Sequence, residues 1–177
     1  MSETGASGGG EASIKAARAG RPEALAALYR DHGATLFRLA YRLTGTREDA
    51  EDVVHDVFVG LPEALVKYQE RGRFPSWLKR VTARVALMRL RARARRREVP
   101  LAAGLPTPDL PADVESAALR AALDALPGPL RCVLVLKEIE GYSHAEVSEL
   151  LGISVVASRV RLNRAVRHLR KNLGTGR

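Results

Sequence analysis

The chain has 177 residues, a formal net charge of +9 at pH 7 and few aromatic residues. Its length allows one domain with a sound core or two small ones, and its basic charge argues for a polyanionic partner, nucleic acid before a membrane. One cysteine excludes an internal disulfide, and no stretch approaches the roughly 18 consecutive apolar residues of a membrane span. Ala, Leu, Arg and Glu are abundant, which is typical of an all-α protein.

The N-terminus, MSETGASGGG, is rich in Gly and Ser and lacks the basic and then apolar segments of a signal peptide. We therefore expect residues 1–12 to be a disordered leader. The lone Cys132 lies in the apolar run CVLVL, which predicts a buried structural thiol and fits a reducing compartment. Together these features predict a cytoplasmic protein.

Two helical segments are expected before residue 44. The first covers 13–19, and Pro22 suits the first turn of the second. Gly33 is expected to break or bend that second helix before a further apolar series, which ends at Leu43. Thr44-Gly45-Thr46 then predicts a turn.

The helix expected from Arg47 to about Val59 is acidic in an otherwise basic chain. Acids in its first turn are favoured by the helix dipole, but this does not account for Asp56. The acidic side is therefore either a solvated surface or a docking face for a basic partner, and charge alone leaves both open. A metal site built on Glu51 and His55 is disfavoured, because the other histidines lie in unrelated patterns.

The segment after this helix begins with an interruption, since Pro62 predicts a kink or an end and restart. A polar loop follows, in which Tyr68 is the better candidate for stacking on a base. A long helix then begins at Pro75. The core stripe expected along it consists of Trp77, Val81, Val85, Met88 and Ala92. No acidic residue lies between Arg71 and Arg97, and such a one-signed stretch is typical of contact with a phosphate backbone.

Residues 98–112 contain four prolines and no periodic apolar pattern. This composition predicts an extended linker and a domain boundary. Beyond it, helices are expected over 113–126 and 130–139, separated by Pro127-Gly128-Pro129.

The last stretch predicts two helices joined by a tight turn. Ser143 and Glu146 form a capping-box pattern, Gly152 can end that helix with positive φ, and Ser154 can cap the second helix. One face of the second helix carries Ser158, Leu162, Ala165, Val166, Leu169 and Leu173. Its remaining surface is basic, with no acid after Glu149. This pattern predicts a helix-turn-helix for the DNA major groove, and the alternative is a helical hairpin with a solvated basic face.

Taken in order, these segments resemble sigma-70-type initiation factors, specifically the compact extracytoplasmic-function group. The resemblance covers nearly all of residues 22–173. The first half matches in LYRDHGATLFRLAYRLTG, DAEDVVHDVFVGL and GRFPSWLKRVTAR, and the second in LDALPGPLRCVLVLKEIEGYSHAEVSELLGIS and SRVRLNRAVRHLRKNL. It implies a region 2-like domain over 13–97, the linker over 98–112 and a region 4-like helix-turn-helix domain over 113–177.

The resemblance also implies a factor with no catalytic residue, metal or cofactor, which binds core RNA polymerase, recognises the −35 and −10 promoter elements and helps to open the promoter. The polymerase would be bound by Asp49, Glu51, Asp52 and Asp56. The −10 element would be bound by Tyr68, Arg71, Arg73, Lys79, Arg80, Arg84 and Arg91. The −35 element would be bound by Val156, Ala157, Arg159, Val160, Arg161, Asn163, Arg164 and Arg167. An anti-sigma factor is a further partner that the resemblance implies for many members.

Several positions depart from the family pattern. His55-Asp56 stands where Gln-Glu is usual, Pro62 where a large residue is usual, and Arg84 and Met88 where Asn and Asp are common. At the start of the last helix, a Gly-Thr pair is replaced by Val156-Ala157 and a serine by Val160. Small apolar side chains cannot hydrogen-bond base edges, but they can contact thymine methyl groups.

Two other classes of function fit the sequence less well. A dimeric helix-turn-helix regulator that binds duplex DNA without polymerase needs neither an acidic helix nor an all-basic helix in a separate domain. An enzyme with helical nucleotide-binding domains is disfavoured, because the sequence shows no Gly-rich phosphate loop, no nucleophile–base pair and no ligand cluster.

Overall fold

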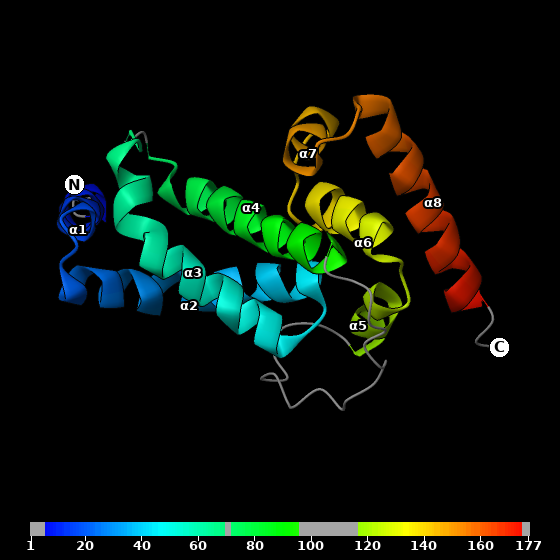
Figure 1. The fold of residues 1–177 in the computed structure, drawn as a ribbon, viewed down its shortest axis with the longest axis horizontal. Helices are drawn as coiled ribbons and strands as arrows, with labels where there is room; N and C mark the ends of the chain where they lie inside the picture. The colour runs from blue at the N-terminus through cyan, green and yellow to red at the C-terminus, as the bar shows by residue number, and fades with distance from the viewer. Residues whose placement is uncertain (1–5, 70–71, 96–116, 175–177) are drawn as a thin grey trace, which may run out of the picture. The chain divides into compact units, whose positions relative to one another are not determined.

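A computed structural model describes residues 6–69, 72–95 and 117–174, and every regular element in these ranges is helical. The first four helices are α1 (Ala6–Arg18), α2 (Pro22–Thr44), α3 (Arg47–Val66) and α4 (Phe74–Arg95). The rest are α5 (Ala117–Asp124), α6 (Gly128–Leu134), the π-helical turn η1 (Val135–Ile139), α7 (His144–Leu151) and α8 (Val155–Gly174). The all-α prediction is confirmed (Figure 1).

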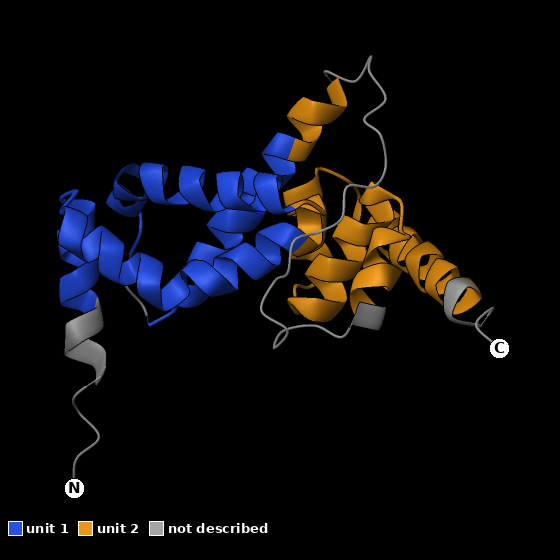
Figure 2. Cartoon of the chain, turned by 90° about the horizontal axis from the view of Figure 1, so that it is seen from below, with its two compact units in different colours: residues 1–41, 47–89 blue, residues 42–46, 90–177 orange. Residues whose placement is uncertain are grey.

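The chain divides into two compact units (Figure 2). Unit 1 comprises Met1–Tyr41 and Arg47–Arg89, and unit 2 comprises Arg42–Thr46 and Leu90–Arg177. The linker expected at 98–112 lies outside the described residues.

The core of unit 1 forms where α2, α3 and α4 meet. The ring centroids of Tyr29 on α2 and Phe58 on α3 are 5.1 Å apart, and those of His32 on α2 and Phe74 at the start of α4 are 5.5 Å apart. Side chains that are almost completely removed from water between these helices include Leu36, Leu39, Val53, Leu61, Leu65 and Leu78. Burial of this many aliphatic side chains is the main favourable term in the folding of the unit.

Helix α1 begins seven residues before the expected start at residue 13, so the prediction of a disordered leader over 1–12 is wrong for residues 6–12. Ile14 and Ala17 are buried, and α1 packs against α3. This packing holds the turn around Ile14 and Ala17 in a helical conformation. Each residue added at the N-terminal side of a formed turn then gains one backbone hydrogen bond, so the helix extends towards the N-terminus.

Neither Gly33 nor Pro62, where a bend or kink was one alternative and a break the other, ends a helix. Helix α2 runs without a break through Gly33, which lies under the ring of Tyr29. Helix α3 continues through Pro62 to Val66, so the end and restart predicted there is wrong. The buried side chains of Leu61 and Leu65 hold this part of α3 in the core and offset the loss of one backbone hydrogen bond at the proline. Figure 1 shows α3 changing direction in its C-terminal part.

The core face of α4 is shifted from the predicted stripe. Met88 is 64% exposed, whereas the buried positions are Phe74, Leu78, Thr82, Ala83, Ala86 and Leu87. Thr82 can be buried because its hydroxyl donates a hydrogen bond to the Leu78 carbonyl, 3.0 Å away. The prediction therefore placed the stripe on a neighbouring face of the helix, whereas the buried face combines three large apolar residues with two alanines and one threonine.

Unit 2 is built on α8, which packs against α5, α6 and α7. Its core contains Cys132, Val133, Val135, Leu136, Val147 and Ala165. The apolar helix expected over 130–139 is confirmed, with its last five residues in the π-helical turn η1.

Candidate nucleic-acid and protein interfaces

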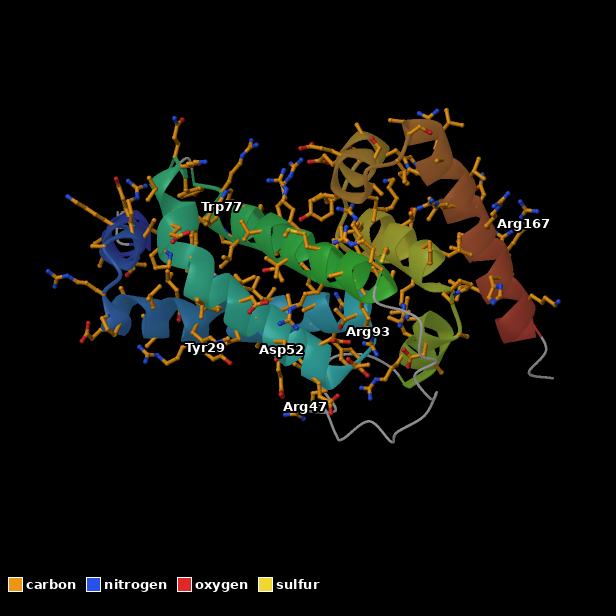
Figure 3. The ribbon with its side chains drawn as sticks, in the orientation of Figure 1. Tyr29, Arg47, Asp52, Trp77, Arg93 and Arg167 are labelled. Atoms are coloured by element: carbon orange, nitrogen blue, oxygen red, sulfur yellow. The ribbon has the colours of Figure 1, made fainter. Side chains whose placement is uncertain are left out.

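The acidic residues of α3 lie opposite the side that packs into unit 1. Ala50, Val53, Val54 and Val57 face the core, and the helix thereby presents Glu51, Asp52 and Asp56 to solvent, with Asp49 half-buried. The structure thus brings the predicted docking residues onto one helix surface, with the side chains of Arg47 and Asp52 projecting from that helix in Figure 3. Glu51 accepts a hydrogen bond of 2.7 Å from Arg47 Nε. We call Asp49, Glu51, Asp52 and Asp56 the acidic surface.

Arg89 on α4 bridges two carboxylates of the acidic surface. Its Nη1 donates to Asp52 Oδ2 at 2.7 Å, and its Nε donates to Asp56 Oδ2 at 2.8 Å. The hydrogen bond to Asp52 has the largest effect on the pKa of Arg89. Together with the hydrogen bond to Asp56 and the charges of both carboxylates, it raises this pKa above its usual value, although burial acts in the opposite direction. Sequence reasoning assigned Arg89 to the all-basic helix and missed this contact, because no local pattern joins residues 37 positions apart. The bridge fixes two carboxylates in one geometry while Asp52 stays 62% exposed.

An aromatic cluster closes the other end of α4. The centroid of the Tyr68 ring lies 4.6 Å from that of Trp77 and 5.6 Å from that of Phe74. Tyr68 is only 8% exposed, and its carbonyl accepts a hydrogen bond of 2.9 Å from Arg18 Nη2. A ring enclosed in this way has to leave its packed position before it can stack on a base, so the predicted role of Tyr68 requires the aromatic cluster to open. The half-buried Trp77 acts as a core anchor, as expected.

The basic residues predicted to bind the −10 element are spread over α4 and the residues before it. Arg73 and Arg84 are exposed, and Lys79 and Arg80 are half-buried. Arg71 lies outside the described residues. Arg91, which belongs to unit 2, is exposed and its Nη2 donates a hydrogen bond of 2.8 Å to the Leu150 carbonyl.

The predicted helix-turn-helix is confirmed in its local chemistry. Ser143 Oγ accepts a hydrogen bond from Glu146 N at 3.2 Å, and Glu146 Oε2 accepts one from Ser143 N at 2.9 Å. Gly152 ends α7 in the left-handed region with φ of 64°. Ser154 Oγ then accepts from Ala157 N at 3.0 Å and caps α8. Side-chain caps thus bond free backbone N–H groups at the starts of α7 and α8. Together with the turn at Gly152, they fix the direction in which α8 leaves α7.

One residue pair joins the two helices of this motif directly. His144 Nδ1 and Ser158 Oγ lie 2.9 Å apart in a hydrogen bond, and Ser158 is fully buried. Burying a hydroxyl requires such a partner. The contact therefore fixes α8 against the start of α7, and sequence reasoning had found in Ser158 only a small residue on the inner face.

The outer face of α8 carries most of the residues predicted to bind the −35 element. The exposed side chains recur at helical spacing and are Val156, Arg159, Val160, Asn163, Arg164, Arg167, Arg170 and Lys171. Figure 3 shows Arg167 projecting away from the neighbouring helices of unit 2. We call these eight residues the outer face of α8.

Two predicted DNA-binding residues do not lie on this outer face. Ala157 and Arg161 are half-buried, and the charge of Arg161 acts on the thiol of Cys132. Burial raises the pKa of Cys132 to about 11, and the charges of Arg131, Arg161 and Arg91 oppose this increase. The prediction of a buried structural thiol is confirmed. Arg161 lies three residues after the buried Ser158 and four before the buried Ala165, which places it on the inner side of α8.

The described residues contain no group of three or more His, Cys, Asp or Glu side chains placed to hold a metal ion. None of the helices in these ranges is both long enough and apolar enough to cross a membrane.

The chain matches two protein families in sequence. Residues 28–96 match the family described as Sigma-70 region 2, and residues 116–169 match Sigma-70, region 4. The chain is 37% identical to the ECF RNA polymerase sigma factor SigE of Mycolicibacterium smegmatis over 82% of its own length, but it spans only 60% of that protein. It is 32% identical to SigM of Mycobacterium tuberculosis, also an ECF RNA polymerase sigma factor, over 83% of this chain and 76% of SigM.

A solved structure agrees with these matches. The structure of CnrH in complex with the cytosolic domain of CnrY superposes on the chain with a TM-score of 0.55 and 26% identity, covering 93% of this chain and 97% of CnrH.

Proposed function

The chain belongs to the extracytoplasmic-function group of the sigma-70 family, and from this premise we propose that it binds core RNA polymerase through α3 and recognises two promoter elements through α4 and α8. The observation that carries the proposal is the pairing of an acidic surface in unit 1 with a basic outer face on the helix-turn-helix of unit 2. A duplex-binding regulator that acts without polymerase needs only the second of these.

The polymerase is bound in this proposal by Asp49, Glu51, Asp52 and Asp56. This assignment is supported by the exposure of three of these side chains on the side of α3 opposite the core. Carboxylates held in one geometry by Arg89 suit a partner surface of Lys and Arg side chains, since complementary charge speeds the encounter and fixes the register of two proteins. An anti-sigma factor remains a predicted second partner, and CnrH, which shares the fold, was solved with a protein bound to it.

The −10 element is bound in this proposal by Arg71, Arg73, Lys79, Arg80, Arg84 and Arg91, which would contact the phosphates of the opening strand. Flipping a base out of the stack takes a few kcal/mol, which contacts to the exposed strand offset. Tyr68 would join them by stacking on a base only after leaving its buried position.

The −35 element is bound in this proposal by the outer face of α8. The first turns of the second helix in a helix-turn-helix contact base edges, and flanking arginines contact phosphates. Ala157 and Arg161 would have a supporting part at most, because both are half-buried.

The proposed domain boundaries are 13–97, 98–112 and 113–177. The chain is a transcription initiation factor, and we assign it no catalytic step of its own. We place its action in the cytoplasm, where core polymerase transcribes.

The experiment that tests the proposal mixes the purified chain with core RNA polymerase and measures complex formation by size-exclusion chromatography and by fluorescence titration. A stoichiometric complex that then protects promoter DNA from nuclease is the expected result. Absence of any complex with core, together with tight binding of the chain alone to duplex DNA, would favour the dimeric regulator instead.

A further inference from the structure

The start of the outer face of α8 is apolar. Val156 is 67% exposed and Val160 is 41% exposed, and they lie one helical turn apart on the same side. Valine is a poorer helix former than alanine, so helix propensity does not favour valine at these two exposed positions. The two side chains together give the start of this face an apolar surface that a partner can contact.

The position of the two valines in the motif determines what they can meet. The capping box of Ser143 and Glu146, the turn at Gly152 and the cap at Ser154 place Val156 and Val160 in the first two turns of the second helix. These are the turns that approach base edges in the major groove. The only apolar group that a base presents there is the C5-methyl group of thymine.

We propose that Val156 and Val160 contact thymine methyl groups in the −35 element, so that this chain recognises an element with thymines at fixed positions. The proposal rests on the proposed function and adds the chemical group that is recognised. The two valines are about 6 Å apart along the helix axis, which is close to two steps of roughly 3.4 Å between bases. The methyl groups contacted therefore lie within two or three base pairs of each other.

Neighbouring residues supply the polar part of the recognition. Arg159 and Asn163 are exposed on the same face, and such side chains can bond bidentately to guanine and to adenine. Arg164 and Arg167 follow along the helix, where they would contact phosphates. An apolar contact flanked by these groups discriminates thymine from cytosine, whose C5 carries hydrogen.

Replacing thymine by uracil removes only the methyl group and keeps the pairing edge, so it tests the proposal directly. The holoenzyme, assembled from the full chain and core polymerase, is first used to map promoter-specific transcripts on genomic fragments and to locate the −35 element. Templates are then built with uracil in place of thymine in that element alone. We expect initiation at subsaturating holoenzyme to fall about fourfold for each methyl contact removed.

The matched protein variant is Val156→Ala combined with Val160→Ala, which keeps α8 folded because alanine is the better helix former. This variant should initiate more weakly than the wild type on the thymine template and should lose no further activity on the uracil template. Circular dichroism confirms that its helical content is unchanged.

The possible outcomes distinguish failure of the valine proposal from failure of the proposed function. Specific transcripts made equally well on thymine and uracil templates would overturn the valine proposal and leave the proposed function standing. A uracil effect that persists undiminished in the double variant would also overturn it, since the methyl groups would then be recognised by other residues. Absence of any promoter-specific transcript would overturn the proposed function and this inference with it.

Discussion

Reversing one charge on the acidic surface should weaken the binding of core polymerase while leaving the chain folded. In Asp52→Lys, Arg89 loses its 2.7 Å ion pair with Asp52 but keeps the 2.8 Å pair with Asp56. Because the Asp52 side chain is 62% exposed, the lost pair is worth about 0.2–1 kcal/mol of unfolding free energy. Repulsion between the introduced lysine and Arg89 adds a similar amount, so the variant should stay folded.

The effect of the same change on docking should be larger than its effect on folding. Close charge pairs across protein interfaces have coupling energies from about 1.5 kcal/mol upwards. We therefore expect the dissociation constant for core polymerase to rise about 30-fold, equivalent to roughly 2 kcal/mol. The assay is fluorescence titration of the labelled chain with core, at two salt concentrations, because screening should reduce the difference at high salt.

The matched control is Asp31→Lys, which makes the same change of net charge at an exposed position of α2. It should bind core almost as the wild type does, and urea unfolding should show both variants within about 2 kcal/mol of the wild type. Equal weakening by Asp52→Lys and Asp31→Lys would show that only net charge matters and would refute the assignment of the acidic surface.

Three further predictions concern unit 2. Arg164→Ala should weaken holoenzyme binding to −35 DNA and reduce the slope of its salt dependence by about one counterion. Arg161→Ala should change this slope much less, because Arg161 is half-buried. Filter binding over a series of salt concentrations compares the two variants. Cys132 keeps its proton to about pH 11 when folded but to only about pH 8.5 when unfolded, so its contribution to stability is complete below pH 8.5 and is lost as pH rises towards 11. Urea unfolding between pH 8 and 11 should therefore show a shallower decline in Cys132→Ala, and parallel declines would contradict the burial of the thiol. Ser143→Ala removes the capping box and should lower the free energy of unfolding by about 1 kcal/mol, measured by thermal unfolding. An unchanged melting temperature would contradict this prediction.

The helix-turn-helix could be predicted from sequence because its determinants are local. Ser143 and Glu146, Gly152, and Ser154 each act on backbone groups within about four residues, and the structure confirms all of them. The acidic surface was equally visible, since helical periodicity alone separates Asp52 and Asp56 from the buried valines.

Features that depend on packing between distant segments could not be predicted in this way. The environment of Tyr68 is set by rings up to nine residues away, and the bridge from Arg89 to Asp52 joins two helices. The inner face of α4 was misplaced because packing in unit 1 buries Leu78 and Leu87 together with small residues and the hydrogen-bonded Thr82, and this choice of face is not visible in the apolar pattern of the helix alone. Pro62 predicted either a kink or an end and restart, and the sequence could not choose between them, because the burial of Leu61 and Leu65 in the core is what carries α3 through the proline.

The most direct test of the central claim is transcription by core RNA polymerase on fragments of the source genome, with and without the purified chain. We expect transcripts that require the chain, and alignment of their start sites should reveal two separated upstream elements. Transcription that the chain leaves unchanged, under conditions in which it binds duplex DNA by itself, would contradict the assignment of this chain as an initiation factor.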